Sequence, residues 1–305
     1  MLRTEALRVF VTVAECGNIK DAADRLFRTQ SAISMTLKQV EDQLGAPLFE
    51  TDRKHSLTDL GQFVQGVATV LLRDHDSAVA LIETYAKGNS GRLRLASVPS
   101  VASRLIPDLL RGFLASRHEA QVDLVDTDSA DVRHLVATGQ ADLGIGSPAG
   151  IEETLLYTPL FQDQLKLVCR TDSAFATLPH PLPWSDVASA TWILNETTRL
   201  ISTPDFLAIA ASAKLRVRNV TSLLAMVQAH VGVTLLPGLA TLALPAGLCA
   251  LPLADASCCR AVGILQRDGR VQSPIAVEFQ RYLVNSIPSL AVQYNLTAMR
   301  PSSAS

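Results

Sequence analysis

The sequence lacks the features of secreted and membrane-spanning proteins. Its five cysteines, an odd number scattered over 305 residues, do not resemble a secreted disulfide framework. The first fifteen residues include Arg3, Glu5, Arg8 and Glu15, so they lack the apolar core of a signal peptide. The most apolar stretch, 235–254, contains three prolines, which would break a membrane helix. We therefore expect a soluble protein located in the cytoplasm.

The sequence also lacks motifs for catalysis or metal binding. Ser147, within Gly-Ile-Gly-Ser-Pro-Ala-Gly, does not fit the G-x-S-x-G frame of a nucleophile elbow. The six histidines lie far apart, without the spacing of a metal pair. A phosphate-binding G-x-x-x-x-G-K-[ST] motif is missing. These absences argue against an enzyme, and we expect neither a metal nor a cofactor.

The sequence also lacks an excess of either positive or negative charge, whereas apolar residues are plentiful. A net charge of −2, from 27 basic and 29 acidic residues, excludes a protein coated in basic charge. Any nucleic-acid site must therefore be confined to one part of the surface and be complementary in shape to the nucleic acid. Apolar residues make up 48% of the chain and charged residues 18%, which is enough for packed cores. The length favours two domains, or three small ones.

The N-terminal segment has the pattern of three helices and a two-stranded wing. A helical run of apolar residues ends at Gly17, and the next residue can cap a second helix. Thr29 can cap a third helix over 30–44, which Gly45 ends. Two short extended segments then flank a charged tip. This pattern predicts a winged helix–turn–helix over 1–58.

In a helix–turn–helix, the second helix of the motif enters the major groove and its first turns reach base edges. Gln can pair with adenine and Ser with several bases, whereas the amides at the helix start suit a phosphate. The wing tip would reach the backbone or the minor groove. The candidate DNA-binding residues are Thr29, Gln30, Ser31, Ser34, Met35, Lys38, Arg53 and Lys54. The alternative is that the helix residues form an ordinary solvated face.

The next segment, 59–88, has the pattern of a long helix that pairs with another helix. Its apolar residues mostly recur at steps of three and four: Leu60, Val64, Val67, Leu71, Ala78, Leu81 and Tyr85. Residues 1–60 hold 8 basic and 9 acidic side chains, so one copy would bind DNA weakly. Pairing through this helix would place several copies on one site. The alternative is a helix packed on its own domain.

From residue 92 onward, short apolar strands alternate with helices, which predicts a parallel sheet covered on both faces. We expect strands at 92–97, 121–127, 141–146, 155–162, 164–170, 191–194, 216–220, 233–236 and 261–265. We expect helices at 105–114, 129–138, 204–214, 222–230 and 273–284. Residues after Pro288 are weakly patterned, and 291–305 are expected to form a tail.

Several of these segments resemble LysR-type transcriptional regulators. The resemblance lies in Asp21-Ala-Ala-Asp-Arg-Leu, Thr29-Gln-Ser-Ala-Ile-Ser, Gln39-Val-Glu-Asp-Gln-Leu-Gly-Ala-Pro-Leu-Phe-Glu and Leu57-Thr-Asp-Leu-Gly. Further family-like stretches are Ala137-Thr-Gly-Gln-Ala-Asp-Leu-Gly-Ile-Gly and Val231-Gly-Val-Thr-Leu-Leu-Pro. The resemblance thus covers about 1–290. One departure is Met35, which stands where many members carry Arg and so bears on one expected DNA contact.

The resemblance implies an α/β protein with an N-terminal winged helix–turn–helix and a two-lobed effector domain similar to periplasmic binding proteins. The implied domains are 1–58 for DNA binding, 59–88 as linker and dimerisation helix, and 92–290 for the effector. Within the last, lobe one would comprise 92–163 and 266–290, and lobe two 164–265. The implied partners are double-stranded DNA, a small-molecule effector, further copies of the chain in a tetramer built from dimers, and RNA polymerase.

Effectors of such regulators lie between the lobes, and the residues point to a similar place. Ligands of open parallel sheets gather at the carboxyl ends of strands and at helix starts. Hydroxyls and amides there can hold a carboxylate or another small anion. The candidate effector-binding residues are Ser97, Ser100, Val101, Thr127, Ser129, Ser147, Thr197 and Thr221. Ordinary helix capping by Ser and Thr is the alternative.

Other functions remain as alternatives. A small-molecule binding protein or transporter component could use the two-lobed fold, but the DNA-binding pattern argues against it. An enzyme of this architecture lacks catalytic spacing. Cys258 and Cys259 invite a redox-sensing interpretation, with Cys249 as a partner only if the fold brings it close. Small, inert apolar side chains are the simpler interpretation of these cysteines.

Overall fold

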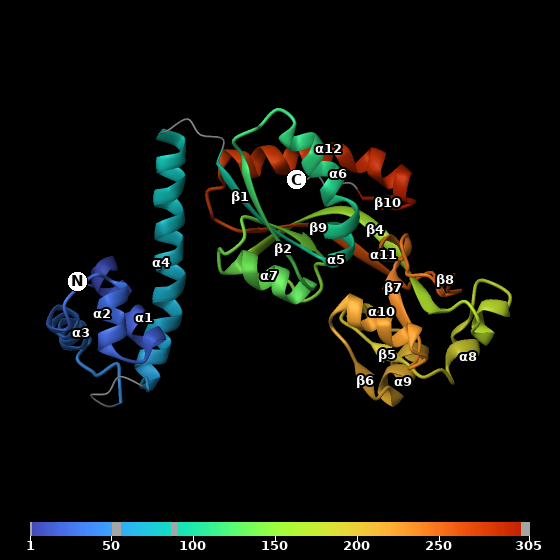
Figure 1. The fold of residues 1–305 in the computed structure, drawn as a ribbon, viewed down its shortest axis with the longest axis horizontal. Coiled ribbons are helices and arrows are strands. Elements are labelled where there is room, and N and C mark those ends of the chain that lie inside the picture. Colours follow the sequence, from blue (N-terminus) through green and yellow to red (C-terminus); the bar gives the residue numbers. More distant parts are fainter. Residues whose placement is uncertain (1, 51–55, 87–90, 300–305) are drawn as a thin grey trace. The chain divides into compact units, whose positions relative to one another are not determined.

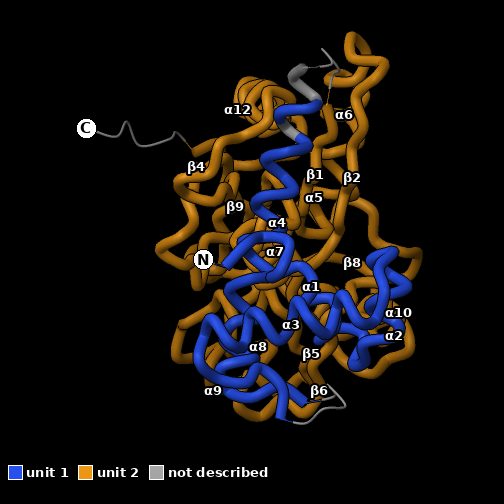
Figure 2. Tube along the Cα trace, turned by 90° about the vertical axis from the view of Figure 1, so that its left-hand side faces the viewer, with its two compact units in different colours: residues 1–87 blue, residues 88–305 orange. Residues whose placement is uncertain are grey.

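The computed structural model describes residues 2–50, 56–86 and 91–299. The chain divides into two compact units, residues 1–87 and 88–305 (Figure 2). Each unit has its own hydrophobic core. Within the described ranges, no helix is long and apolar enough to cross a membrane.

The first unit is helical, and its helices begin and end at local sequence signals. Its elements are α1 (Thr4–Cys16), α2 (Ile19–Arg25), α3 (Gln30–Leu44) and α4 (Asp59–Ala86) (Figure 1). Thr29 Oγ1 accepts a hydrogen bond from Ala32 N at 3.3 Å, which caps α3. Gly45 ends the same helix with a φ of 72°, a left-handed value that glycine tolerates best. The predicted bounds of this helix are confirmed.

The predicted wing consists, in its described part, of one antiparallel bridge. Phe49 pairs with Leu57, and Glu50 N donates to Ser56 O at 2.9 Å. The wing tip, with the candidate DNA-binding residues Arg53 and Lys54, lies outside the described residues.

Helix α4 buries part of its apolar residues in its own unit and exposes the rest. Leu60 and Val64 pack against the core of the first unit, together with the buried Ala68 and Leu72. The large apolar side chains that stay exposed are Phe63, Val67 and Leu71, on the side adjoining this buried stripe, and Val79 and Ile82 farther along the helix. The apolar residues predicted to form one pairing seam are thus divided, because Leu60 and Val64 pack inside the first unit whereas Val67 and Leu71 stay exposed.

The second unit is built on a mixed sheet with the strand order β10-β4-β9-β3-β1-β2. The strands are β1 (Arg92–Ser97), β2 (Gln121–Asp126), β3 (Leu143–Gly146), β4 (Leu155–Arg170), β9 (Cys259–Arg267) and β10 (Thr297–Ala298). Strand β1 runs parallel to β2 and β3, whereas β9 is antiparallel to β3 and β4. The prediction of an all-parallel sheet is therefore wrong. Two long strands cross from one lobe to the other and return, which makes the sheet mixed.

Helices α5 (Pro99–Arg104), α6 (Ile106–Leu114), α7 (Ser129–Ala137) and α12 (Pro274–Tyr294) belong to the first lobe (Figure 1). The helix predicted at 105–114 corresponds to α6, and a separate short helix, α5, precedes it. Helix α12 extends beyond the predicted end at Val284 and through Pro288 to Tyr294, and Thr297–Ala298 form β10, so these residues of the predicted tail are ordered elements. Burial of Ile287 and Leu290 offsets the hydrogen bond that proline cannot make.

The second lobe is formed by the far half of β4 and the segments that follow it. Its strands are β5 (Ile193–Leu194), β6 (Leu215–Arg216), β7 (Thr234–Pro237) and β8 (Leu248–Pro252), and its helices include α8 (Trp184–Val187), α9 (Pro204–Ser212), α10 (Val220–Gln228) and α11 (Gly238–Thr241). The strands predicted at 155–162 and 164–170 are one continuous strand, β4. The strand predicted at 216–220 is wrong in extent, because Asn219 caps α10 and Val220 begins it.

The boundary between the lobes on the return strand also differs from the predicted one. Val262, Ile264 and Leu265 of β9 are buried in the core of the first lobe. Cys258 is buried in the core of the second lobe. The chain thus re-enters the first lobe along β9, before the predicted boundary at 266.

Candidate DNA-binding and effector-binding sites

The predicted DNA-contacting residues of α3 share one exposed face. Thr29, Gln30, Ser31, Ser34, Met35 and Lys38 are all exposed in the described chain. Met35 is 62% exposed although it is apolar. The opposite side of the helix packs through Ile33, Leu37 and Val40 into the core of the unit. The fold therefore leaves this polar face available to a partner outside the domain.

Two basic side chains that precede α3 in the sequence are paired with carboxylates of the same unit. Arg28 Nη2 lies 2.8 Å from Glu5 Oε1, and Arg25 Nη1 lies 2.9 Å from Glu15 Oε2. These exposed ion pairs offset charge that would otherwise attract phosphates, and they are weak enough for DNA to compete. Lys38 adds an exposed cation on α3 itself.

The structure brings four of the predicted effector residues together at one edge of the sheet. Thr127 N donates to Ser97 O at 3.0 Å, so the ends of β2 and β1 meet. Ser147 N donates to Ser129 Oγ at 3.3 Å, which joins the end of β3 to the start of α7. The carboxyl ends of neighbouring parallel strands lie at the same edge of a sheet, so the residues that follow these strands come together there.

The capping alternative does not describe these hydroxyls. Helix α7 is capped by Asp128, whose carboxylate accepts from two backbone amides, and not by Ser129. Helix α5 begins after Val98 and has no side-chain cap, so Ser100 is not a cap either. Asn219 caps α10, one of whose exposed residues is Thr221. None of Ser100, Ser129 and Thr221 is therefore the side-chain cap of its helix, whereas Thr127 Oγ1 donates to Asp131 Oδ2 in the first turn of α7 at 3.1 Å.

Three predicted effector residues lie apart from this group. Val101 is 1% exposed and belongs to the core of the first lobe. Thr197 lies in a 3₁₀ turn of the second lobe, and Thr221 is exposed on α10. Within the described residues, no hydrogen bond joins either threonine to the four residues at the sheet edge. Only a ligand spanning both lobes would contact all of them.

A buried arginine that the sequence interpretation missed lies behind Ser100. Arg260 on β9 is 7% exposed, and its Nη2 donates to Ser100 Oγ at 2.5 Å. Its Nη2 also lies 3.4 Å from Asp163 Oδ2, whereas its Nε has no hydrogen-bond partner among the described residues. The signal in the sequence is a charged residue within an apolar strand, because such residues are almost never buried without a partner.

Burial shapes the electrostatics of this pair. Burial raises the pKa of Asp163 above its usual value, although Arg260 and the amide of Leu239 act in the opposite direction. Burial also lowers the pKa of Arg260, against the attraction of Asp163. Both charges have lost water, and at 3.4 Å their mutual attraction replaces it incompletely.

An ion pair joins the two lobes beside the sheet edge. Arg218, which precedes α10 in the second lobe, donates to the carboxylate of Asp128 at the start of α7. Its Nη2 also lies 3.1 Å from Asp131 Oδ2. Burial alone would raise the pKa of Asp128, but the hydrogen bonds from Arg218 and two backbone amides lower it. The contact holds the second lobe next to the predicted effector residues.

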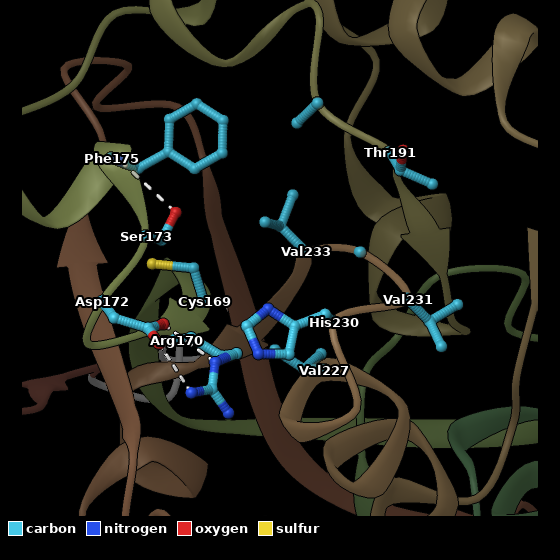
Figure 3. Close-up of a pocket in the computed structure, with 12 residues that line it drawn as sticks. Cys169, Arg170, Asp172, Ser173, Phe175, Thr191, Val227, His230, Val231 and Val233 are labelled. Carbon is cyan, nitrogen blue, oxygen red and sulfur yellow. Dashed lines mark hydrogen bonds and ion pairs between the residues drawn. The ribbon is translucent and has the colours of Figure 1, made fainter.

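The second lobe contains a pocket, which is separate from the predicted effector residues (Figure 3). It has a volume of about 290 Å³ and is lined by residues that include Cys169, Arg170, His230 and Thr191. Arg170 is held by Asp172, with an Nη2–Oδ2 distance of 2.7 Å. None of the predicted effector residues lines this pocket. Among the described residues, no group of three His, Cys, Asp or Glu side chains could hold a metal ion.

Comparison with known proteins agrees with this architecture. Residues 4–62 match the family model of bacterial regulatory helix-turn-helix proteins, lysR family, and residues 86–287 match the LysR substrate binding domain. The fold and these matches define a two-part regulatory protein with a DNA-binding unit and a ligand-binding unit. The chain belongs to the LysR family of transcriptional regulators.

Individual relatives are distant. The transcriptional regulator CitR of Bacillus subtilis (strain 168) is 29% identical over 170 residues, which cover 55% of this chain and 58% of CitR. The regulator YbhD of Escherichia coli (strain K12) is 26% identical over 289 residues, which cover 92% of this chain and 90% of YbhD.

Solved structures of the family share the fold. CbnR complexed with its target DNA superposes with a TM-score of 0.69 at 21% identity, covering 93% of this chain and 100% of that chain. A full-length variant of OxyR from Pseudomonas aeruginosa gives a TM-score of 0.62 at 19% identity, covering 94% of this chain and 95% of that chain.

Proposed function

We propose that this regulator controls transcription by reading an operator with the exposed face of α3, while an anionic effector at the first lobe sets its activity. The observation that carries the DNA part is the separation of α3 into a buried apolar side and an exposed polar side. Gln30, Ser31 and Ser34 occupy the first turns of the helix, where base edges are reached in helix–turn–helix proteins. The protein would act in the cytoplasm, with RNA polymerase as a further partner.

The DNA assignment is tested with two substitutions at the helix start. Gln30→Ala and Ser34→Ala should lower discrimination between operator and unrelated DNA by about 1–3 kcal/mol for a lost base contact. Arg53→Ala should weaken binding to every sequence, because a wing-tip cation contacts the backbone. The measurement is a binding titration on both DNAs at fixed salt.

Gln43→Ala is the matched control, since Gln43 is also exposed on α3 but lies in its last turn. Its discrimination should equal that of the wild type. If Gln30→Ala and Ser34→Ala also keep full discrimination, α3 does not read the bases.

We also propose that α4 pairs with the α4 of a second copy, and that two such dimers form a tetramer. The support is the exposed apolar face of α4, with Phe63 69% and Val67 54% exposed. Contiguous exposed apolar side chains of this kind mark interaction surfaces. Pairing would also double the number of phosphate contacts, which compensates for the balanced charge of the DNA-binding unit.

The effector is proposed to be a small carboxylate or a similar anion. Ser100 Oγ accepts from Arg260, so its own O–H remains able to donate to a ligand. Arg260 supplies the positive charge behind that hydroxyl, with Nε unsatisfied by described residues. A charge-assisted hydrogen bond network of this type favours anions over neutral molecules.

A thermal-shift screen of the full chain tests the effector class. Small carboxylates should raise the unfolding temperature, whereas the corresponding primary amides should not, because binding to the folded state stabilises it. A screen in which amides stabilise the protein as well as the acids do would contradict an anionic effector.

A further inference from the structure

Two cysteines far apart in the sequence face each other across β4 and β8. Cys169 on β4 and Cys249 on β8 are directly opposed in the antiparallel register. Their Sγ atoms are 3.6 Å apart, and both cysteines are free thiols. The sequence interpretation had considered Cys249 only as a partner for Cys258 and Cys259.

The strand register places these two residues within reach of a disulfide, because they are opposed on neighbouring strands and their sulfurs are already 3.6 Å apart. Thr171 N donates to Gly247 O at 2.9 Å, which makes those two opposed residues a hydrogen-bonded pair. Hydrogen bonding alternates along an antiparallel ladder, so Cys169 and Cys249 are a hydrogen-bonded pair as well. Cβ atoms in such pairs lie about 5 Å apart or more, against about 3.5–4.5 Å in disulfides. The bond therefore needs a small shift of the two strands toward each other in addition to side-chain rotation.

The two thiols have different environments, which assigns them different roles. Cys169 is fully buried, and burial followed by the contact with Cys249 raises the pKa of its thiol to about 12. Cys249 is only half-buried, so an oxidant reaches it first. Cys169 also lines the pocket of the second lobe, beside Ser173 (Figure 3).

The neighbouring pair Cys258 and Cys259 is less suited to this chemistry. Cys258 is buried, and burial raises the pKa of its thiol to about 12 as it does for Cys169, so this property does not distinguish the two pairs. Cys259 Sγ accepts a hydrogen bond from Gln162 Nε2 at 2.6 Å, which holds it toward β4. A bond between adjacent cysteines would also close a strained ring.

We propose that Cys169 and Cys249 are a reversible redox site, which a hydroperoxide converts to a disulfide. The Cys249 sulfur attacks one peroxide oxygen, the O–O bond breaks, and water leaves when the oxidant is hydrogen peroxide. Cys249 is then a sulfenic acid. The Cys169 sulfur attacks the Cys249 sulfur, the S–S bond forms, the S–O bond breaks, and the thiol proton leaves with the hydroxide as water. Two thiols lose two electrons and two protons, and one peroxide becomes two waters.

The bond would change the second lobe in two ways. It closes a loop between residues 80 positions apart in the sequence, which stabilises the folded lobe against unfolding. It also moves the Cys169 side chain, which forms part of the pocket wall. A disulfide between two strands is accessible to small reductants from the side of the half-buried Cys249, so the reaction is reversible.

The test is peroxide treatment of the full-length protein, followed by counting of free thiols and peptide mapping under non-reducing conditions. The wild type should lose two of its five thiols and yield one linked peptide pair containing Cys169 and Cys249. Its unfolding temperature should rise, and a dithiol reductant should reverse both changes. These measurements use the wild-type protein alone, so they do not depend on the folding of any variant.

Variants then separate the roles of the two sulfurs. Cys249→Ser should prevent both the thiol loss and the rise in unfolding temperature. Cys169→Ala should leave a sulfenic acid at Cys249, which a 1,3-diketone reagent labels. Cys16→Ser is the matched control and should behave as the wild type, because Cys16 lies in the other unit. A linked pair of Cys258 and Cys259, bridges between chains, or five thiols remaining after treatment would overturn the proposal.

Discussion

Replacing Arg260 by methionine should reveal how strongly the buried ion pair constrains the second unit. The substitution Arg260→Met keeps a long apolar stem but leaves Asp163, which is 3% exposed, without its cation. Breaking a buried pair from one side costs about 3–5 kcal/mol, because an uncompensated charge remains. In a domain of this size the unfolding temperature should fall by about 10 °C. The double variant Arg260→Met with Asp163→Asn should recover most of the loss, since no buried charge then remains.

The assay is thermal unfolding of the full chain followed by tryptophan fluorescence. Trp184 and Trp192 are the two tryptophans of the sequence, and both are buried in the second lobe, so the signal reports this unit. Arg92→Met is the control, because its ion pair with Asp123 is exposed and its loss should hardly move the midpoint.

The pH dependence gives a second check on the same variant. Burial raises the pKa of Asp163 in the folded protein above its unfolded value, and removal of Arg260 raises it further. Protonation then favours the folded state, so the stability lost in Arg260→Met should return as the pH falls through the raised pKa. If the single variant is as stable as the wild type near neutrality, or if the double variant is no better than the single one, the pair does not carry the energy assigned to it.

Three further substitutions address assembly, the effector and the contact between the lobes. Leu71→Asp should yield smaller oligomers that bind DNA poorly, because Leu71 is 45% exposed among the apolar side chains of α4 that are proposed to pair. Light scattering measures the mass, and a wild-type mass would mean that these side chains do not pair. Ser129→Leu should abolish the effector response but keep DNA binding, whereas Ser185→Leu, at an exposed serine of α8, should leave both unchanged. Calorimetric titration with an identified effector decides, and normal affinity in Ser129→Leu would remove this serine from the site. The pKa of Asp128 is lowered in the folded protein, so its pairing with Arg218 stabilises the protein above the unfolded pKa of this carboxyl, and that stability is lost as the pH falls through the folded pKa. Asp128→Asn should therefore reduce the loss of stability at acid pH in a plot of unfolding free energy against pH. An unchanged plot would contradict the role of the pair.

Local signals were sufficient for helix α3 and for part of the sheet edge. Thr29 and Gly45 start and stop the helix by short-range hydrogen bonding and by φ preference, so the bounds of α3 could be predicted from neighbouring residues alone. The spacing of apolar residues then determines which side of the helix is buried. The meeting of Ser97 with Thr127 could be predicted for the same kind of reason, because neighbouring parallel strands end at one edge.

What the sequence by itself determined is therefore the bounds of α3, the exposed face of that helix and the family to which the chain belongs. Only the tertiary structure decided the contacts between distant segments: Arg260 behind Ser100, and Cys169 opposite Cys249. Those contacts depend on the register of β4 with β9 and β8, which is set by the packing of whole lobes. Helix α12 shows the same limit, because long-range burial of its last turns outweighs the local stop signal of its proline.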